Sequence, residues 1–218
     1  MSAAVQAESQ SQQYKEMFRL ALSLNEGELE AFQRYADLLQ RWSGAINLVA
    51  RSTLGDVWRR HFLDSAQLVE LVGNSDGTWV DLGSGAGFPG LVVAILAKRR
   101  FPDMSVTLIE ADQRKAAFLR SVSRETSTPV RIIADRVERV PPLGARIVSA
   151  RAFAPLPDLL DHASRHLAPG GVCLFPKGRN FRSEIERARK EWHFTCEAIP
   201  SRVEDDAAIL KIGEIERA

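Results

Sequence analysis

The spacing of apolar residues predicts two helices in the first third of the chain. A capping-box-like pair, Asn25 and Glu28, begins the first, and its apolar face follows as Leu29, Phe32, Ala36 and Leu39. A second face of the same period predicts a helix over residues 56–72, carried by Trp58, Phe62, Ala66 and Val69. The polar, glycine-flanked residues 73–77 then predict a break. We therefore expect a helical extension over residues 14–75, followed by a second unit.

Short apolar runs alternate with amphipathic stretches from residue 76 to residue 218. Strands are expected at residues 78–82, 106–110, 130–134, 145–150, 171–176, 193–199 and 207–213. Helices are expected at residues 89–99, 112–124, 157–167 and 180–191. Alternation of this kind predicts a parallel sheet, and the last two strands must form an antiparallel hairpin because their connection is too short for a crossover. The expected fold is therefore Rossmann-like α/β, with a seven-stranded, mostly parallel sheet.

The ends and cysteines of the chain limit the remaining possibilities. Residues 1–13 are rich in Ser, Ala and Gln and lack Lys and Arg, so we expect a disordered tail rather than a signal peptide. No apolar run approaches the roughly 20 residues that cross a membrane, and the cytoplasm is the expected compartment. Cys173 and Cys196 have no metal-ligand spacing, so we expect no metal.

Charge is unevenly distributed although the net charge is only +1. Residues 1–75 hold 7 Lys and Arg against 9 Asp and Glu, whereas residues 98–151 hold 12 against 6. A locally basic surface fits a polyanionic partner, but solvated helix faces would give the same imbalance.

The segment from Asp81 to Gly90 reads D-L-G-S-G-A-G-F-P-G and joins a predicted strand to a predicted helix. Glycines at alternate positions let backbone approach a ligand, and Pro89 suits a first helical turn. Such a loop is where α/β sheets bind nucleotide-like ligands, although a glycine-rich turn without a ligand is the plain alternative.

The acidic residues near this loop favour S-adenosylmethionine as the ligand. Gly85, Gly87 and Gly90 also match the dinucleotide fingerprint, which alone is weak. Asp81 could hold the cationic amino acid end of S-adenosylmethionine, directly or through water. Glu110 ends the next strand, where a ribose-binding carboxylate is expected. We therefore predict an S-adenosylmethionine-dependent methyltransferase fold.

Two missing motifs restrict the atom that accepts the methyl group. Enzymes that methylate exocyclic amines commonly carry a D/N-P-P-Y/F/W turn, but residues 149–155 read S-A-R-A-F-A-P. Cytosine C5 enzymes use a thiolate in a Pro-Cys turn, and neither cysteine here follows a proline. Guanine N7 needs neither device because it carries an exposed lone pair. Alignment with the methyl group can then suffice, without a general base.

Six motifs in order resemble the bacterial ribosomal RNA small subunit methyltransferase G family, also called glucose-inhibited division protein B. They are Asn47-Leu48-Val49, residues 60–65 (R-H-F-L-D-S), the glycine loop, Arg136-Val137-Glu138, residues 149–153 and Pro176-Lys177-Gly178. The resemblance extends from about Leu29 to Gly213. It implies methylation of guanine N7 at position 527 of 16S ribosomal RNA. The loop departs from commoner family versions at Ser84 and Ala86, where Thr and Pro occur.

The resemblance also implies roles for individual residues. With Asp81 and Gly85, expected from the loop pattern itself, the residues expected at the cofactor are Asp81, Gly83, Gly85, Phe88, Glu110, Val137, Glu138 and Arg151. Candidates for positioning RNA or the target guanine are Arg136, Arg151, Lys177, Arg179, Asn47, His61 and Asp64. Asn47 could instead cap a turn, and His61 with Asp64 could be a simple i,i+3 helix pair. The expected partner is 16S rRNA, the small ribosomal subunit or an assembly intermediate, and the protein is expected to be a monomer.

Three rival functions fit parts of the same pattern. A methyltransferase with a small-molecule acceptor would share the fold and cofactor loop. A nicotinamide-dependent oxidoreductase would share the glycine fingerprint. An RNA-binding protein with an inactive cofactor site would share the basic surface, although the intact Asp81, Gly83, Gly85 and Glu110 weaken that alternative.

Overall fold

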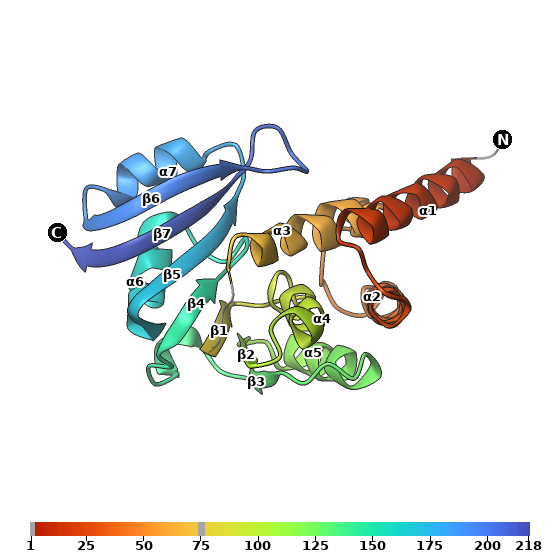
Figure 1. The fold of residues 1–218 in the computed structure, drawn as a ribbon, viewed down its shortest axis with the longest axis horizontal. Coiled ribbons are helices and arrows are strands. Elements are labelled where there is room, and N and C mark those ends of the chain that lie inside the picture. Colours follow the sequence, from red (N-terminus) through yellow and green to blue (C-terminus); the bar gives the residue numbers. More distant parts are fainter. Residues whose placement is uncertain (1–2, 74–76) are drawn as a thin grey trace.

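The computed structural model describes residues 3–73 and 77–218. Its centre is a seven-stranded sheet, whose strands are labelled in Figure 1. The strands lie in the order β3-β2-β1-β4-β5-β7-β6. They are β1 Gly77–Leu82, β2 Met104–Ile109, β3 Arg131–Ile133, β4 Ala145–Ser149, β5 Leu167–Lys177, β6 Trp192–Pro200 and β7 Ala208–Arg217. Strands β1 to β5 pair in parallel, whereas β7 is antiparallel to both β5 and β6. The predicted α/β fold and terminal hairpin are confirmed.

Alternating side chains along the strands contribute to two hydrophobic cores, one on each face of the sheet. Trp79 packs into one core, and its neighbour Val80 packs into the other. The first core is covered by α4 Gly90–Arg100 and α5 Gln113–Glu125, and the second by α6 Leu156–His166 and α7 Phe181–Ala188. Because β1 to β5 run parallel, their carboxyl ends lie at one edge of the sheet, and most of the candidate site residues come directly after these strands.

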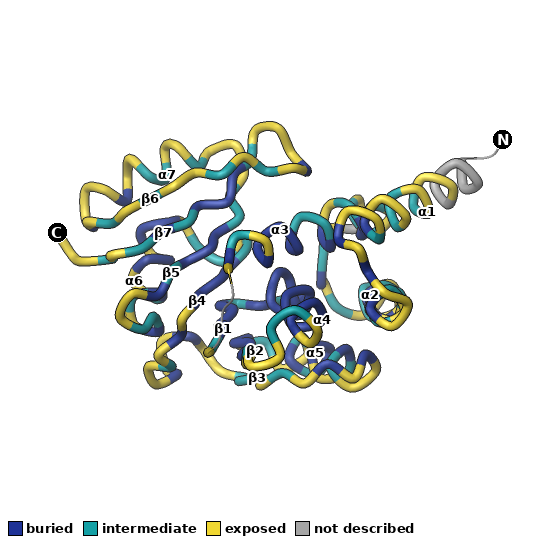
Figure 2. The backbone as a smooth tube through the Cα atoms, viewed as in Figure 1, coloured by how far each residue is buried: buried dark blue, intermediate teal, exposed yellow. Residues whose placement is uncertain are grey.

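The N-terminal helices add a further layer to the first core. Helix α2, Glu26–Trp42, begins with the predicted capping box between Asn25 and Glu28. Its Phe32 and Tyr35 are fully buried in the core that also contains Leu91 of α4. The division of the chain at residue 75 stays a prediction, since residues 74–76 of the expected break lie outside the described residues. Residues from both sides of that break nevertheless pack in one core, and Figure 2 shows buried segments in α3 (Asp64–Glu70) before the break and in α4 after it.

Two N-terminal elements differ from expectation. Helix α1 spans Ala3–Ala21, where a disordered tail is expected over residues 1–13. Ala and Gln are favourable helix formers, and Phe18 near the far end of this helix is fully buried, so the helix is anchored by packing at that end. The single helix expected over residues 56–72 is instead a 3₁₀ turn (Arg51–Asp56), a π-helix (Trp58–Leu63) and α3 (Asp64–Glu70). The π-helical turn carries His61, and such turns often occur at functional sites.

In the described part of the chain, no helix combines the length and apolar character that a membrane span requires.

Candidate functional site

The glycine loop after β1 is packed closely between Phe153 on one side and Tyr35 on the other. Gly83 has φ +62°, and a Cβ built there would lie 2.1 Å from Cδ2 of Phe153. The buried hydroxyl of Tyr35 donates a hydrogen bond to the Ala86 carbonyl. Any side chain at Gly83 would therefore both strain the backbone and displace the aromatic ring that faces it.

Glu110 directly follows β2 and accepts a hydrogen bond from the glycine loop that follows the neighbouring strand, β1. In the parallel register Leu82 lies opposite Ile109, so Glu110 adjoins the start of the loop. Its Oε2 accepts the Gly85 N–H at 2.7 Å, and its Oε1 accepts the Asp112 N–H at 2.8 Å. A carboxylate offers about four lone-pair sites, so each oxygen can still accept a ligand hydroxyl.

These residues line a cavity of about 490 Å³ at the edge of the sheet. Seven residues predicted to contact the cofactor lie together on its wall, namely Gly83, Gly85, Phe88, Glu110, Val137, Glu138 and Arg151, as does the RNA candidate Arg136. The cavity combines a buried carboxylate with an open glycine backbone. A carboxylate that accepts hydrogen bonds, beside backbone that a ligand can approach closely, fits a nucleoside with two ribose hydroxyls such as S-adenosylmethionine.

Asp81 does not reach this cavity. The residue is fully buried, Ser149 Oγ donates to its Oδ1 at 2.7 Å, and the Gly90 N–H donates to its Oδ2 at 3.3 Å. Burial raises the pKa of this carboxyl to about 6, against the lowering effect of these hydrogen bonds. The side chain fastens β1 to β4 and to the start of α4, so direct contact with a ligand is not available to it.

A second, larger cavity of about 810 Å³ adjoins the first. The two share five lining residues, Leu48, Val49, Arg151, Ala152 and Phe153, which we call the shared wall. Two ligands, one in each cavity, would therefore lie next to each other at Arg151, and a chemical group could be transferred from one to the other there.

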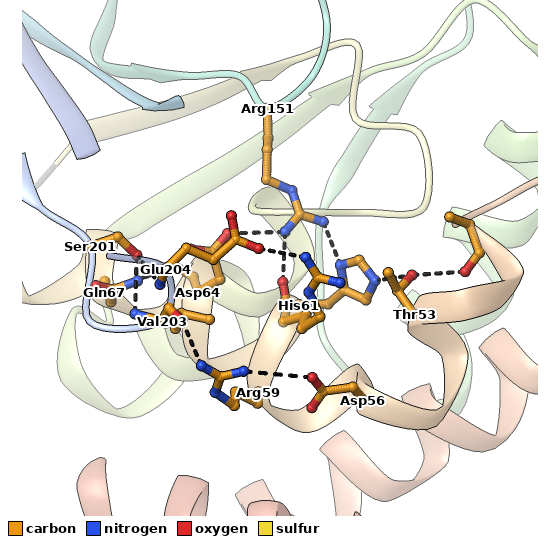
Figure 3. A network of polar contacts seen from close by, with 12 residues as sticks. Thr53, Asp56, Arg59, His61, Asp64, Gln67, Arg151, Ser201, Val203 and Glu204 are labelled. Atoms are coloured by element: carbon orange, nitrogen blue, oxygen red, sulfur yellow. Dashed lines mark hydrogen bonds and ion pairs between the residues drawn. The ribbon is translucent and has the colours of Figure 1, made fainter. Parts of the chain in front are cut away.

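Arg151 is held by the π-helical turn (Figure 3). Its Nη1 donates to Asp64 Oδ2 at 3.1 Å and to the Arg60 carbonyl at 3.2 Å. Its Nη2 lies 2.9 Å from Nδ1 of His61, while Nε2 of His61 lies 2.9 Å from Thr53 Oγ1. These contacts draw residues from far apart in the sequence to one point of the shared wall.

The same contacts fix the protonation of His61. A guanidinium can only donate, so Nδ1 of His61 must accept and Nε2 must carry the hydrogen. Thr53 Oγ1 accepts that hydrogen and donates its own to the Ala50 carbonyl. Burial, with the positive charges of Arg151 and Arg60, lowers the pKa of His61 to about 3. The ring is therefore neutral, with both nitrogens occupied.

The Phe88 ring packs against both His61 and Arg151. Its ring stacks on His61, with centroids 4.9 Å apart, and on Tyr35 at 5.4 Å. The Arg151 guanidinium lies 4.9 Å from the same ring centroid. Such a cation–π contact helps to keep Arg151 at the shared wall while its nitrogens bind the π-helical turn.

The remaining predicted residues divide into two groups. Lys177 lines the larger cavity, where its Nζ donates to Glu184 Oε2 at 2.8 Å and to the Ala154 carbonyl at 2.9 Å. Asn47 and Arg179 are exposed and line neither cavity. The roles of all these residues stay predictions.

Sequence reasoning missed several residues of the larger cavity: Thr53, Arg60, Glu184 and Glu204. Arg60 Nη2 contacts Glu204 Oε1 at 2.6 Å, across 144 positions of the chain. Nothing in a single sequence links two such positions. Arg60 is the first residue of the R-H-F-L-D-S motif, and that membership was the signal that could have marked it as a site residue.

A family model and several individual relatives assign the chain to the same family. A family model described as rRNA small subunit methyltransferase G matches residues 28–208. Proteins named ribosomal RNA small subunit methyltransferase G are 49% identical over 192 residues in Cereibacter sphaeroides and 51% over 198 residues in Rhodospirillum centenum. The first match covers 88% of this chain and 92% of the relative, and the second 91% and 89%.

Solved structures of more distant proteins show the same fold. A SAM-dependent methyltransferase from Aquifex aeolicus has a TM-score of 0.52 at 13% identity, covering 68% of this chain and 88% of its own. P. horikoshii TYW2 in complex with MeSAdo also has a TM-score of 0.52, at 12% identity, covering 72% and 62%.

Proposed function

The chain belongs to the rRNA small subunit methyltransferase G family, and from that membership we propose that it methylates N7 of one guanine in 16S rRNA, at position 527 by resemblance. The methyl donor is S-adenosylmethionine. The observation that carries this proposal is the pair of cavities meeting at Arg151, one suited to the donor and the other large enough for a base. RNA-binding without catalysis would not require two adjoining cavities.

The smaller cavity would hold the donor through Glu110 and the loop backbone. Glu110 would accept both ribose hydroxyls, Phe88 would provide apolar contact, and the backbone at Val137 and Glu138 would flank the adenine. S-adenosylmethionine supplies an electrophilic methyl group on a sulfonium when it is bound. The protein then has only to orient the two ligands across the shared wall.

The protonation of the wall supports transfer without a general base. Guanine N7 presents a lone pair and has no proton to lose. Both nitrogens of His61 are occupied, and Asp64 binds Arg151 at 3.1 Å. The His61 ring has no nitrogen free to remove a proton, and the Asp64 carboxylate is engaged by the Arg151 guanidinium, so positioning is the contribution that these side chains make to the transfer.

The RNA would approach over exposed cations at the cavity mouths. Arg136 is exposed on the rim of the smaller cavity, and Arg179 is exposed just beyond the end of β5. The target base must leave its stack to enter the larger cavity, as enzymes that act on bases require. The substrate is 16S rRNA, the small subunit or an assembly intermediate, and the enzyme is expected to act as a cytoplasmic monomer.

Methyl transfer from labelled S-adenosylmethionine tests this function and its substrate together. Three acceptors are compared: naked 16S rRNA, small subunits lacking the modification, and small subunits that already carry it. We expect one methyl group per unmodified acceptor and none on the modified one. Label in a small molecule or no transfer to any RNA would refute the proposal.

A further inference from the structure

Three carboxylates in the larger cavity each lie beside a cation, but among the described residues only Glu184 combines a well-buried ion pair with an oxygen that accepts no hydrogen bond. Asp64 accepts from Arg151 on Oδ2 and from Gln67 on Oδ1. The side chains of Glu204 and its partner Arg60 are 48% and 42% exposed. An ion pair that is exposed to solvent contributes little energy and therefore does little to hold a ligand in one orientation. Glu184, in contrast, is 22% exposed and its partner Lys177 only 11%.

Glu184 keeps one oxygen free among residues 3–73 and 77–218. Its Oε2 accepts Lys177 Nζ at 2.8 Å and the Leu156 N–H at 3.0 Å. No described residue donates to its Oε1. Lys177 has three N–H groups and uses two, on Glu184 and on the Ala154 carbonyl. The pair therefore presents one unused acceptor beside one unused donor.

This arrangement matches one edge of guanine. The Watson–Crick edge of guanine carries the acceptor O6 next to the donors N1–H and N2–H₂, whereas adenine carries a donor next to an acceptor. We propose that Lys177 donates to O6 and that Oε1 of Glu184 accepts from N1–H and N2–H₂ of the target base. This inference rests on the proposed function, and it assigns guanine selection to a pair of residues that contact each other.

The position of the pair agrees with the position of the reacting atom. Lys177 binds the carbonyl of Ala154, which directly follows Phe153 of the shared wall, and Glu184 binds the N–H of Leu156, two residues further. In guanine, O6 lies between N7 and N1. With N7 at the shared wall, O6 and then N1 would follow in the order in which Lys177 and Glu184 occur.

Charge favours a base over a phosphate at this place. The Lys177 ammonium is neutralised by Glu184 at 2.8 Å, so the pair offers a phosphate little net attraction. Phosphate contacts fall instead to cations without a close carboxylate. A neutral pair that combines donor and acceptor is suited to read a base edge.

Single-turnover methylation of reconstituted small subunits tests the inference. The subunits carry either guanosine or inosine at the target position, because inosine lacks only the N2 amino group. Wild-type protein is compared with Glu184→Gln and with Asp161→Asn, which removes an exposed carboxylate paired with Arg217 outside both cavities. Thermal unfolding and S-adenosylmethionine affinity are measured for each protein.

We expect the wild type and Asp161→Asn to be about tenfold or more slower on inosine, as for a lost hydrogen bond to a charged group. Glu184→Gln should be slower on guanosine by a similar factor and treat both bases alike within about threefold, with unchanged cofactor affinity. Lys177→Met gives a second test, since it should slow both bases while keeping the preference for guanosine. An undiminished guanosine preference in Glu184→Gln would overturn the inference. Failure of the wild type on both subunits would overturn the proposed function itself.

Discussion

Replacing Glu110 by glutamine removes one acceptor from the smaller cavity with little change in shape. The two carboxylate oxygens accept different backbone N–H groups, Gly85 at 2.7 Å and Asp112 at 2.8 Å. An amide has one acceptor oxygen and one NH₂ group, so its NH₂ must face one of these donors and cannot accept a ribose hydroxyl. A hydrogen bond to a charged group contributes about 1.5–3 kcal/mol. We therefore expect Glu110→Gln to weaken S-adenosylmethionine binding by about 10- to 150-fold.

Titration calorimetry with S-adenosylmethionine measures this change directly. Glu197→Gln is the matched control, because Glu197 is exposed on β6 and lines neither cavity. The control should bind within about twofold of the wild type, a difference below about 0.5 kcal/mol. Unfolding by urea without ligand shows whether the Glu110 variant still folds. A folded Glu110→Gln protein with the affinity of the wild type would refute the placement of the ribose at Glu110.

Three further results are expected. Gly85→Ala should weaken cofactor binding far more than Gly144→Ala in calorimetry, because both glycines have positive φ and room for a Cβ but only Gly85 lines the cavity; equal effects would show that backbone strain alone is responsible. The pKa of His61 is lowered from 6.5 to about 3, so the unfolded chain binds the proton first and stability falls as pH drops through that range. His61→Asn should therefore lose less stability than the wild type between pH 7 and pH 5, by about 2 kcal/mol in urea unfolding, and equal losses would contradict the neutral, buried ring. Arg136→Ala should slow methylation and reduce the salt slope by about 0.7, whereas an unchanged slope, like that expected of the exposed Arg120→Ala, would place the RNA elsewhere.

The order of elements was predictable because hydrophobic periodicity is a local property. The alternating strands from Gly77 onward followed from it, and the capping box followed from an equally local signal, the residue pair Asn25 and Glu28. The gathering of candidate residues around the smaller cavity was predictable for a related reason, since residues after parallel strands must share one edge of the sheet. Glu110 and Arg151 reached the same cavity in this way.

The remaining features depend on packing that periodicity does not describe. Strand alternation turns Asp81 toward the start of α4 rather than toward the smaller cavity, where Gly90 approaches it closely. The π-helical turn around His61 keeps an apolar face that resembles that of an ordinary helix. Glu184 lies in a helix whose sequence gives no indication of Lys177 as its partner. Helix α1 was missed because its polar composition resembles that of a disordered tail.

Transfer to guanine N7 is tested by mapping the atom that receives the methyl group. Small subunits lacking the modification are incubated with the protein and labelled S-adenosylmethionine, and the rRNA is then treated with a reagent that cleaves the chain at N7-methylguanosine. We expect cleavage at a single guanine of 16S rRNA, with all the label in the nucleoside at that site. Label on an exocyclic amine, a ring carbon or a ribose hydroxyl, with no cleavage, would contradict it.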